Sequence, residues 1–143
     1  MINFDGFDLK RLIIDSLAGL AVSLVIGIVL FWLTLGTVQF YDAGVYSTGL
    51  TEISFVVGVL VASALFGSMK KDIISAGILG LIIGLLTSLF EGLVLSFFFS
   101  PMTVQFVMDW WGNPTVILIF VGVLAGIGSN IIFSRKNQIA QAI

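Results

Sequence analysis

Four long apolar segments alternate with short polar ones along the chain. They are Leu12–Leu35, Thr51–Met69, Ile73–Ser100 and Pro114–Phe133. Each is 19 to 28 residues long and free of Lys and Arg, which is typical of helices that cross the hydrocarbon core of a bilayer. Strands of a membrane β-barrel would instead alternate over segments of about ten residues. The pattern predicts an all-α integral membrane protein with four transmembrane helices in one domain, residues 1–143.

The positive charges lie only in the short segments between or beyond these helices. They are Lys10, Arg11, Lys70, Lys71, Arg135 and Lys136. Two apolar segments separate each pair from the next, so all three pairs fall on one side of the membrane. Lys and Arg mark the cytoplasmic side, and we therefore expect a multi-pass protein of the cell membrane with both termini in the cytoplasm. Asp15 follows Arg11 by four residues, so the two can pair on one helix face.

A short motif suggests that the chain is an internal repeat. Thr-Val-Gln-Phe occurs at Thr37–Phe40 and at Thr103–Phe106, each time just beyond an outward-going helix, and Val-Gly-Val-Leu also occurs once in each half. We expect two tandem helical hairpins with repeat units 10–69 and 70–136. Both hairpins enter from the cytoplasm, so this would be a parallel repeat about an axis along the membrane normal. The alternative is one hairpin pattern used twice without common descent.

Composition supports the prediction of a membrane protein and limits the kinds of functional site that the chain can form. The 143 residues are 59% hydrophobic and 10% charged, against about 25% charged in soluble domains. Cys and His are absent, which excludes thiolate metal sites, His-ligated haem and His-based acid–base catalysis. We expect no cofactor, no bound metal and no enzymatic activity. Nucleic-acid binding is also disfavoured, because the cations come in isolated pairs and the sequence pI is about 4.7.

Small residues on every segment indicate how the helices pack. Apolar burial gives no drive between helices already in lipid, so small residues that permit close approach must provide the contacts. The third segment is the most regular, with a small residue every four positions from Ala76 to Ser96, and we expect it to be the central packing element. The glycines expected at helix contacts are Gly19, Gly27, Gly58, Gly80, Gly84, Gly122 and Gly126.

Aromatic and turn residues mark the outer ends of the helices. Trp32, Trp110 and Trp111 fall at the predicted outer boundary, where tryptophan rings anchor helices at the headgroup level. A ligand cage built from these rings is the alternative. Asn113 and Pro114 predict the start of the fourth helix, as N-cap and first residue. The basic pair at 135 and 136 is expected to close it.

The acidic residues are the strongest candidates for a functional site. Glu91 is the only ionisable residue well inside an apolar segment. Glu52 lies 18 residues before Lys70. Glu91 lies 20 residues after Lys71. At the rise of an α-helix, both glutamates are roughly 27–30 Å from the inner boundary, so we expect them at similar height near the outer edge of the membrane.

Three arrangements of these carboxylates fit the sequence. In the first, Glu91 and Glu52 reach interfacial water or hydroxyl partners. In the second, the two converge, with Ser88 and Thr87 as polar lining, and share a proton or hold a cation. In the third, an acid pairs with Arg or Lys of a partner subunit. Asn130, the other buried polar residue of note, is expected to bond across to a neighbouring helix.

Two functions follow from these features. The favoured one is a small non-catalytic accessory or assembly subunit of a larger membrane complex. The chain offers packing surface, an aromatic belt and an outer rim of acidic residues, which are Asp42, Glu52, Glu91 and Asp109. Its partners would be the lipid bilayer and other subunits or further copies of itself. The alternative is a small homo-oligomeric transporter or channel, coupled to protons or cations, that uses Glu91 and Glu52.

Overall fold

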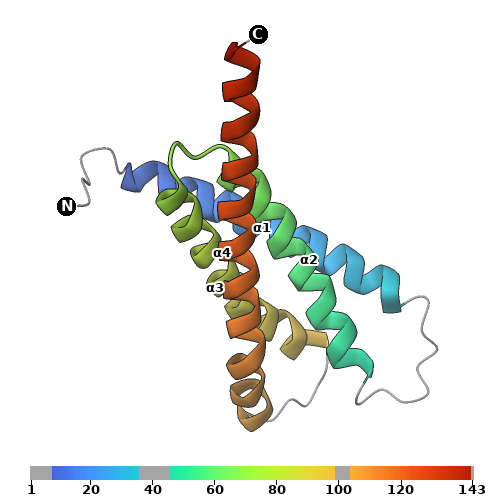
Figure 1. The fold of residues 1–143 in the computed structure, drawn as a ribbon. Coiled ribbons are helices and arrows are strands. Elements are labelled where there is room, and N and C mark those ends of the chain that lie inside the picture. The colour runs from blue at the N-terminus through green and yellow to red at the C-terminus, as the bar shows by residue number, and fades with distance from the viewer. Residues whose placement is uncertain (1–7, 36–45, 99–103, 143) are drawn as a thin grey trace.

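The fold is built from helices throughout the residues that the computed structural model describes, which are 8–35, 46–98 and 104–142. The helices are α1 (Leu9–Leu35), α2 (Tyr46–Ser68), α3 (Ile73–Phe98) and α4 (Val104–Ala142) (Figure 1). No strand occurs in these described ranges. The prediction of an all-α protein with four helices is therefore confirmed.

Three of the helices are long and apolar enough to cross a membrane. Their apolar stretches are Leu9–Leu33 in α1, Ile73–Glu91 in α3 and Thr115–Ala142 in α4. The stretch found in the described part of α2 is shorter, Ile53–Ser68. Large apolar side chains are exposed on every helix, among them Val25, Leu60, Leu85 and Phe120. Lipid is the solvent that such a surface requires, so the fold supports a membrane protein.

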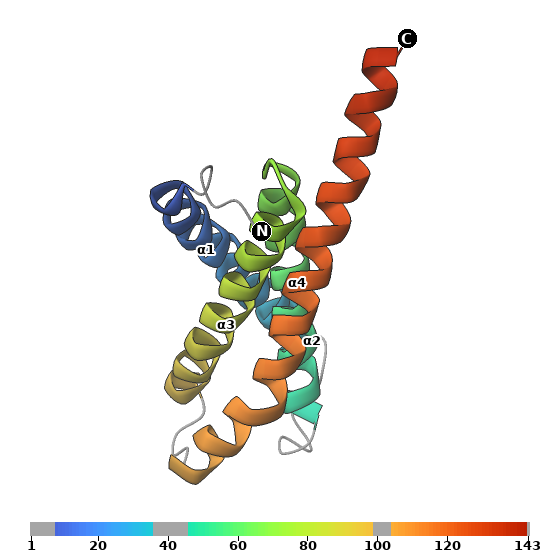
Figure 2. The same cartoon turned by 60° about the vertical axis from the view of Figure 1, so that its left-hand side comes forward.

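The helices α2 and α3 form the middle of the bundle. Each contacts the other and also contacts both α1 and α4, whereas α1 and α4 do not meet within the described residues. Figures 1 and 2 show α4 as the longest rod and α1 crossing the bundle obliquely. In the predicted repeat, α1 would correspond to α3 and α2 to α4, so the contact between α2 and α3 would have a counterpart between α4 and α1. The described residues show no such contact, so the repeat stays a prediction from sequence.

The limits of α4 differ from those expected. The helix runs without a break through Asn113 and Pro114 and ends at Ala142, so the predicted start at Pro114 and end at Phe133 are wrong. An interior proline removes one backbone hydrogen bond, a loss that membrane helices tolerate. Past Phe133, Arg, Lys and Gln are strong helix formers, and no residue there stops the helix. With 39 residues, α4 is about 58 Å long.

Aspartates set the beginnings of α1 and α3. The Arg11 backbone N–H donates to Asp8 Oδ1 at 3.1 Å, and the Ser75 backbone N–H donates to Asp72 Oδ1 at 2.7 Å. Each aspartate therefore satisfies a backbone donor that has no partner within its own helix. The Asp8 cap explains why α1 begins at Leu9, before the first residue of the apolar segment. The backbone and hydroxyl hydrogen bonds from Ser75 hold the pKa of Asp72 below its usual value of 3.8.

Replacement of Asp72 by alanine tests this cap. We expect a loss of about 1 kcal/mol in the free energy of unfolding near neutral pH. Because the folded-state pKa is lowered, the contribution of the charged cap is complete above the unfolded-state pKa and disappears as pH falls through the folded-state pKa. Thermal unfolding in detergent at about pH 7 and about pH 2.5 should therefore show a gap between wild type and Asp72→Ala that narrows in acid.

Asparagine provides the matched control, because Asp72→Asn keeps an N-cap acceptor and removes the titrating group. It should stay close to wild type at neutral pH. A gap between wild type and the alanine variant that is unchanged in acid would contradict the role assigned to the carboxylate.

Candidate functional site

Glycines bring the helix backbones into direct contact around the centre of the bundle. Gly80 of α3 and Gly122 of α4 lie back to back, so a Cβ atom on either would overlap the carbonyl oxygen of the other. A Cβ on Gly126 would lie 2.5 Å from the carbonyl oxygen of Ala76. In the same way Gly58 of α2 lies against the backbone of α1 at Ser23. These approaches fix which faces of the helices meet.

The remaining expected glycines also face neighbouring helices. A Cβ on Gly84 would overlap the backbone of α4 at Leu118. Gly19 and Gly27 of α1 face the side chains of Ile83 and Phe55. All seven glycines named from the sequence therefore lie at helix contacts, where a larger residue would push two elements apart.

Hydroxyl side chains of α3 link it to two other helices. Thr87 Oγ1 donates to Ser23 Oγ of α1 at 3.0 Å. Ser88 Oγ and Thr115 Oγ1 of α4 are 2.5 Å apart, and either can be the donor. Thr87, Ser88 and Ser23 are buried. Hydrogen bonds of this kind hold helices together where lipid provides no hydrophobic drive.

Glu91 continues the same face of α3 by one turn. Its side chain is 0% exposed, so protein atoms separate the carboxylate from both lipid and water. Thr87 and Glu91 are four residues apart and therefore on one side of the helix. The structure thus brings Glu91, Thr87 and Ser88 together on the buried face of α3, as their spacing indicated. Glu52 lies in the first half of α2, and its side chain is outside the described residues.

The tryptophans are only partly described. Trp32 lies near the end of α1 with its side chain 56% exposed, as a ring at the membrane interface would be. Trp110 and Trp111 lie in α4, with side chains outside the described residues. A ligand cage of the three rings therefore stays a hypothesis.

An ion pair joins α1 to the turn between α2 and α3. Lys70 Nζ donates to Asp15 Oδ2 at 2.5 Å, with side-chain exposures of 10% for Lys70 and 20% for Asp15. Arg11 Nε is 4.0 Å from the same oxygen. The sequence predicted only this longer pair, because Arg11 is four residues from Asp15 whereas Lys70 is 55 residues away.

The amide of Asn130 ties α4 to the same turn. Asn130 Nδ2 donates to the carbonyl oxygens of Gly67 at 3.1 Å and Lys70 at 2.7 Å. The Gly67 carbonyl belongs to the last turn of α2 and also accepts from the Lys70 backbone N–H at 3.1 Å, whereas the Lys70 carbonyl lies in the turn beyond the helix. The expected cross-helix bond of Asn130 is therefore present, and it serves as a cap supplied by another helix. Together with the ion pair, it gathers the start of α1, the turn and α4 at one end of the molecule.

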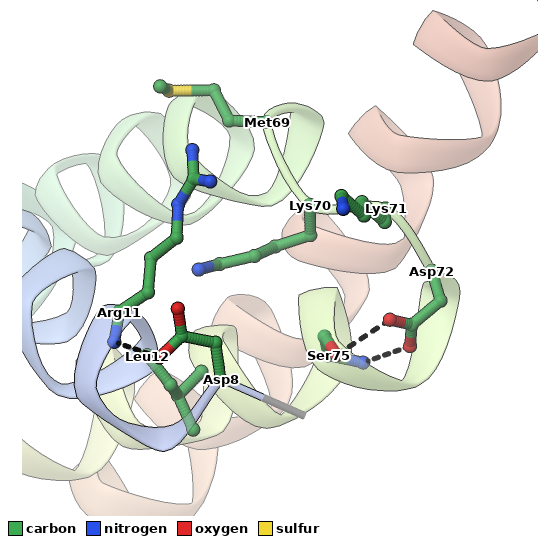
Figure 3. A pocket seen from close by; sticks show the side chains of 8 residues that line it. All are labelled: Asp8, Arg11, Leu12, Met69, Lys70, Lys71, Asp72 and Ser75. Atoms are coloured by element: carbon green, nitrogen blue, oxygen red, sulfur yellow. Dashed lines mark hydrogen bonds between the residues drawn. The ribbon is translucent and has the colours of Figure 1, made fainter. Parts of the chain in front are cut away.

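Two hollows flank the turn at this end. The α1-side hollow holds about 210 Å³, and its charged lining consists of Asp8, Arg11, Lys70, Lys71 and Asp72 (Figure 3). The α4-side hollow holds about 280 Å³. Its lining is Ser68, Lys70, Lys71, Asn130, Phe133, Ser134 and Asn137. The lysines of the turn thus border both hollows.

Within the described residues, His, Cys, Asp and Glu form no group of three or more that could hold a metal ion. Comparison of the chain with protein-family models, with curated proteins and with solved structures finds no match.

Proposed function

We propose that this protein handles a proton or a cation at Glu91, as a small ion-coupled transporter or channel. The observation that carries the proposal is the complete burial of the Glu91 side chain. An acid inside a membrane segment costs up to about 2.5–3.5 kcal/mol at the helix centre on insertion scales, and less toward the outer edge, where Glu91 is expected. Buried acids within membrane segments commonly belong to ion or proton pathways.

The surroundings of Glu91 support this role. Thr87 and Ser88 lie one turn away on α3, with hydroxyls engaged to Ser23 of α1 and Thr115 of α4. A hydroxyl accepts one hydrogen bond and donates another, so it can relay a proton that leaves the carboxylate, and its oxygen can coordinate a cation. Four helices seldom enclose a path alone, so we propose a homo-oligomer. Glu52, which we expect at similar height on α2, is the second carboxylate of this proposal.

The orientation of the protein belongs to the same proposal. Lys70 contacts α1 through Asp15 and contacts α4 through Asn130, so the basic pairs of α1 and of the turn lie at the same end of the bundle. The basic pair of α4 follows Asn130 by little more than one turn. This clustering supports a cytoplasmic location for that end and for both termini, and it leaves Glu91 toward the opposite side.

Flux through proteoliposomes tests the proposal. Purified protein is reconstituted with a pH-sensitive dye inside, and proton entry is measured under an imposed membrane potential. We expect Glu91→Gln to lower the flux at least tenfold, because glutamine keeps the shape of the side chain and cannot exchange a proton. A hydrophobic carbodiimide, which reacts with protonated carboxyl groups, should modify Glu91 and block the wild-type flux.

The matched control is Ser16→Ala. Ser16 is also buried, and its hydroxyl has no hydrogen-bond partner among the residues that the structure describes, so its loss should leave the flux unchanged. Equal flux from wild type and Glu91→Gln, or flux no greater than that of empty liposomes, would refute the proposal. Measurements with K⁺ and Na⁺ gradients distinguish a proton from a metal cation.

The second candidate is an accessory or assembly subunit of a larger membrane complex, and the length of α4 favours it. At about 58 Å, α4 exceeds a hydrocarbon core of about 30 Å, and residues from Ile132 onward are exposed. A helix that leaves the bundle in this way offers a docking surface outside the membrane. Native mass spectrometry of mildly solubilised membranes decides: a stoichiometric partner supports this candidate, and the protein alone or with copies of itself contradicts it.

A further inference from the structure

The α4-side hollow has the charge of an anion site. Among the described residues, its lining includes the two lysines of the turn and no carboxylate. The α1-side hollow shares both lysines but also contains Asp8 and Asp72, and Figure 3 shows the ammonium group of Lys70 on that side, toward Arg11 and Asp8. The carboxylates that line the α1-side hollow would repel a phosphate bound there. The hollow beside α4 is therefore the better place for a negatively charged ligand.

We propose that the α4-side hollow binds the phosphate of an anionic lipid headgroup. Lys71 is exposed, and its ammonium group is the charged donor for the phosphate oxygens. Asn137 is also exposed and adds a neutral donor from α4. The ammonium of Lys70 is engaged with Asp15, so Lys70 contributes its alkyl stem and its charge at longer range.

The position of the hollow favours a lipid over a free phosphate. Phe133 lines the hollow, with 48% of its surface exposed, and Ile132 beside it is more exposed still. This apolar surface lies just before the basic pair Arg135 and Lys136 of α4, which we expect at the depth of the glycerol backbone and upper acyl chains. A lipid phosphate seated by Lys71 would therefore place its apolar part against Phe133. Anionic lipids are abundant in the cytoplasmic leaflet, the side on which the basic pairs are expected.

Retention of defined lipids by the full chain tests the inference. Native mass spectrometry in mild detergent compares phosphatidylglycerol with phosphatidylcholine of the same acyl chains. We expect wild type to retain at least fivefold more phosphatidylglycerol than phosphatidylcholine. In Lys71→Gln, the amount of retained phosphatidylglycerol should fall about fivefold. Lys71 is exposed, so the variant should unfold at the wild-type temperature, which separates a lost site from a lost fold.

Lys136→Gln is the matched control. Lys136 carries the same charge at the same end of the molecule and does not line the hollow, so its variant should retain phosphatidylglycerol within about twofold of wild type. Equal losses in the two variants would show general attraction of anionic lipid to the basic end and would overturn the inference.

A soluble ligand separates the two sources of phosphate. Inorganic phosphate or glycerol phosphate at millimolar concentration should leave the retained phosphatidylglycerol in place, because neither offers an apolar part to Phe133. Displacement of the lipid from wild type by either compound would assign the hollow to a free phosphate if Lys71→Gln abolishes that displacement. This result would overturn the lipid assignment.

Discussion

Replacing Gly122 by alanine is expected to lower the free energy of unfolding by about 3 kcal/mol, the upper part of the range for overpacked cores. The added methyl group would overlap the carbonyl oxygen of Gly80 and meet the side chain of Val59. A side chain could move aside, but the carbonyl belongs to the backbone of α3. The helices α3 and α4 must therefore separate along their whole contact. Thermal unfolding in detergent, or steric trapping in bicelles, measures the loss.

Gly128 of the same helix is the control, because a Cβ atom there has no atom of the described residues within 4 Å. Gly128→Ala should be neutral or stabilising by up to about 1 kcal/mol, since alanine is the better helix former. The double variant Gly80→Ala with Gly122→Ala should lose less than the sum of the single losses, because one separation of the helices accommodates both methyl groups. Equal stability of Gly122→Ala and Gly128→Ala would show that the backbones are not in contact.

Replacing Asp15 by asparagine is expected to cost about 2 kcal/mol, below the 3–5 kcal/mol of a fully buried pair because the side chain of Asp15 is 20% exposed. The substitution leaves the ammonium of Lys70, only 10% exposed, without its charged acceptor. The turn between α2 and α3 would then lose its attachment to α1. The loss is measured by thermal unfolding in detergent at moderate salt.

Arg11→Gln is the matched control for this pair. The Arg11 side chain is 63% exposed and its Nε is 4.0 Å from Asp15 Oδ2, so its removal should cost at most about 0.5 kcal/mol. Exchanging the charges, with Asp15→Lys and Lys70→Asp together, should recover part of the stability that each single change loses. A larger cost for Arg11→Gln than for Asp15→Asn would mean that Lys70 is not the main partner.

The limits of α4 show where local sequence signals fail. Asn113 and Pro114 are good helix-start residues, and the basic pair at 135 and 136 is a common helix end. Neither signal ends a helix by itself, because membrane helices tolerate an interior proline and a basic pair continues a helix when the flanking residues favour helical structure. Pro114 costs one hydrogen bond, whereas ending the helix there would leave several backbone groups to be satisfied elsewhere. A longer helix therefore replaced the expected loop in the described residues from Val104 onward.

Only part of the candidate site could likewise be predicted from local sequence signals. Residues four apart share a helix face whatever surrounds them, so Thr87 and Glu91 could be placed together from spacing alone. Their partners could not, because Ser23 and Thr115 become neighbours only through the glycine contacts that bring α1 and α4 onto α3. The amide of Asn130 could likewise be expected to bond across helices, while its acceptors at Gly67 and Lys70 depended on the path of the turn.

The sequence by itself predicted four helices, an apolar surface suited to lipid and the grouping of the basic pairs, though not the limits of α4, because apolar length, residue spacing and charge act along the chain. The tertiary structure alone decided that Glu91 is enclosed by protein and that Lys70 bonds to Asp15. Both depend on which helix faces meet, and backbone contacts at residues such as Gly80 and Gly122 select those faces between segments distant in the chain. The capture of Lys70 by a helix 55 residues away is a consequence of that packing.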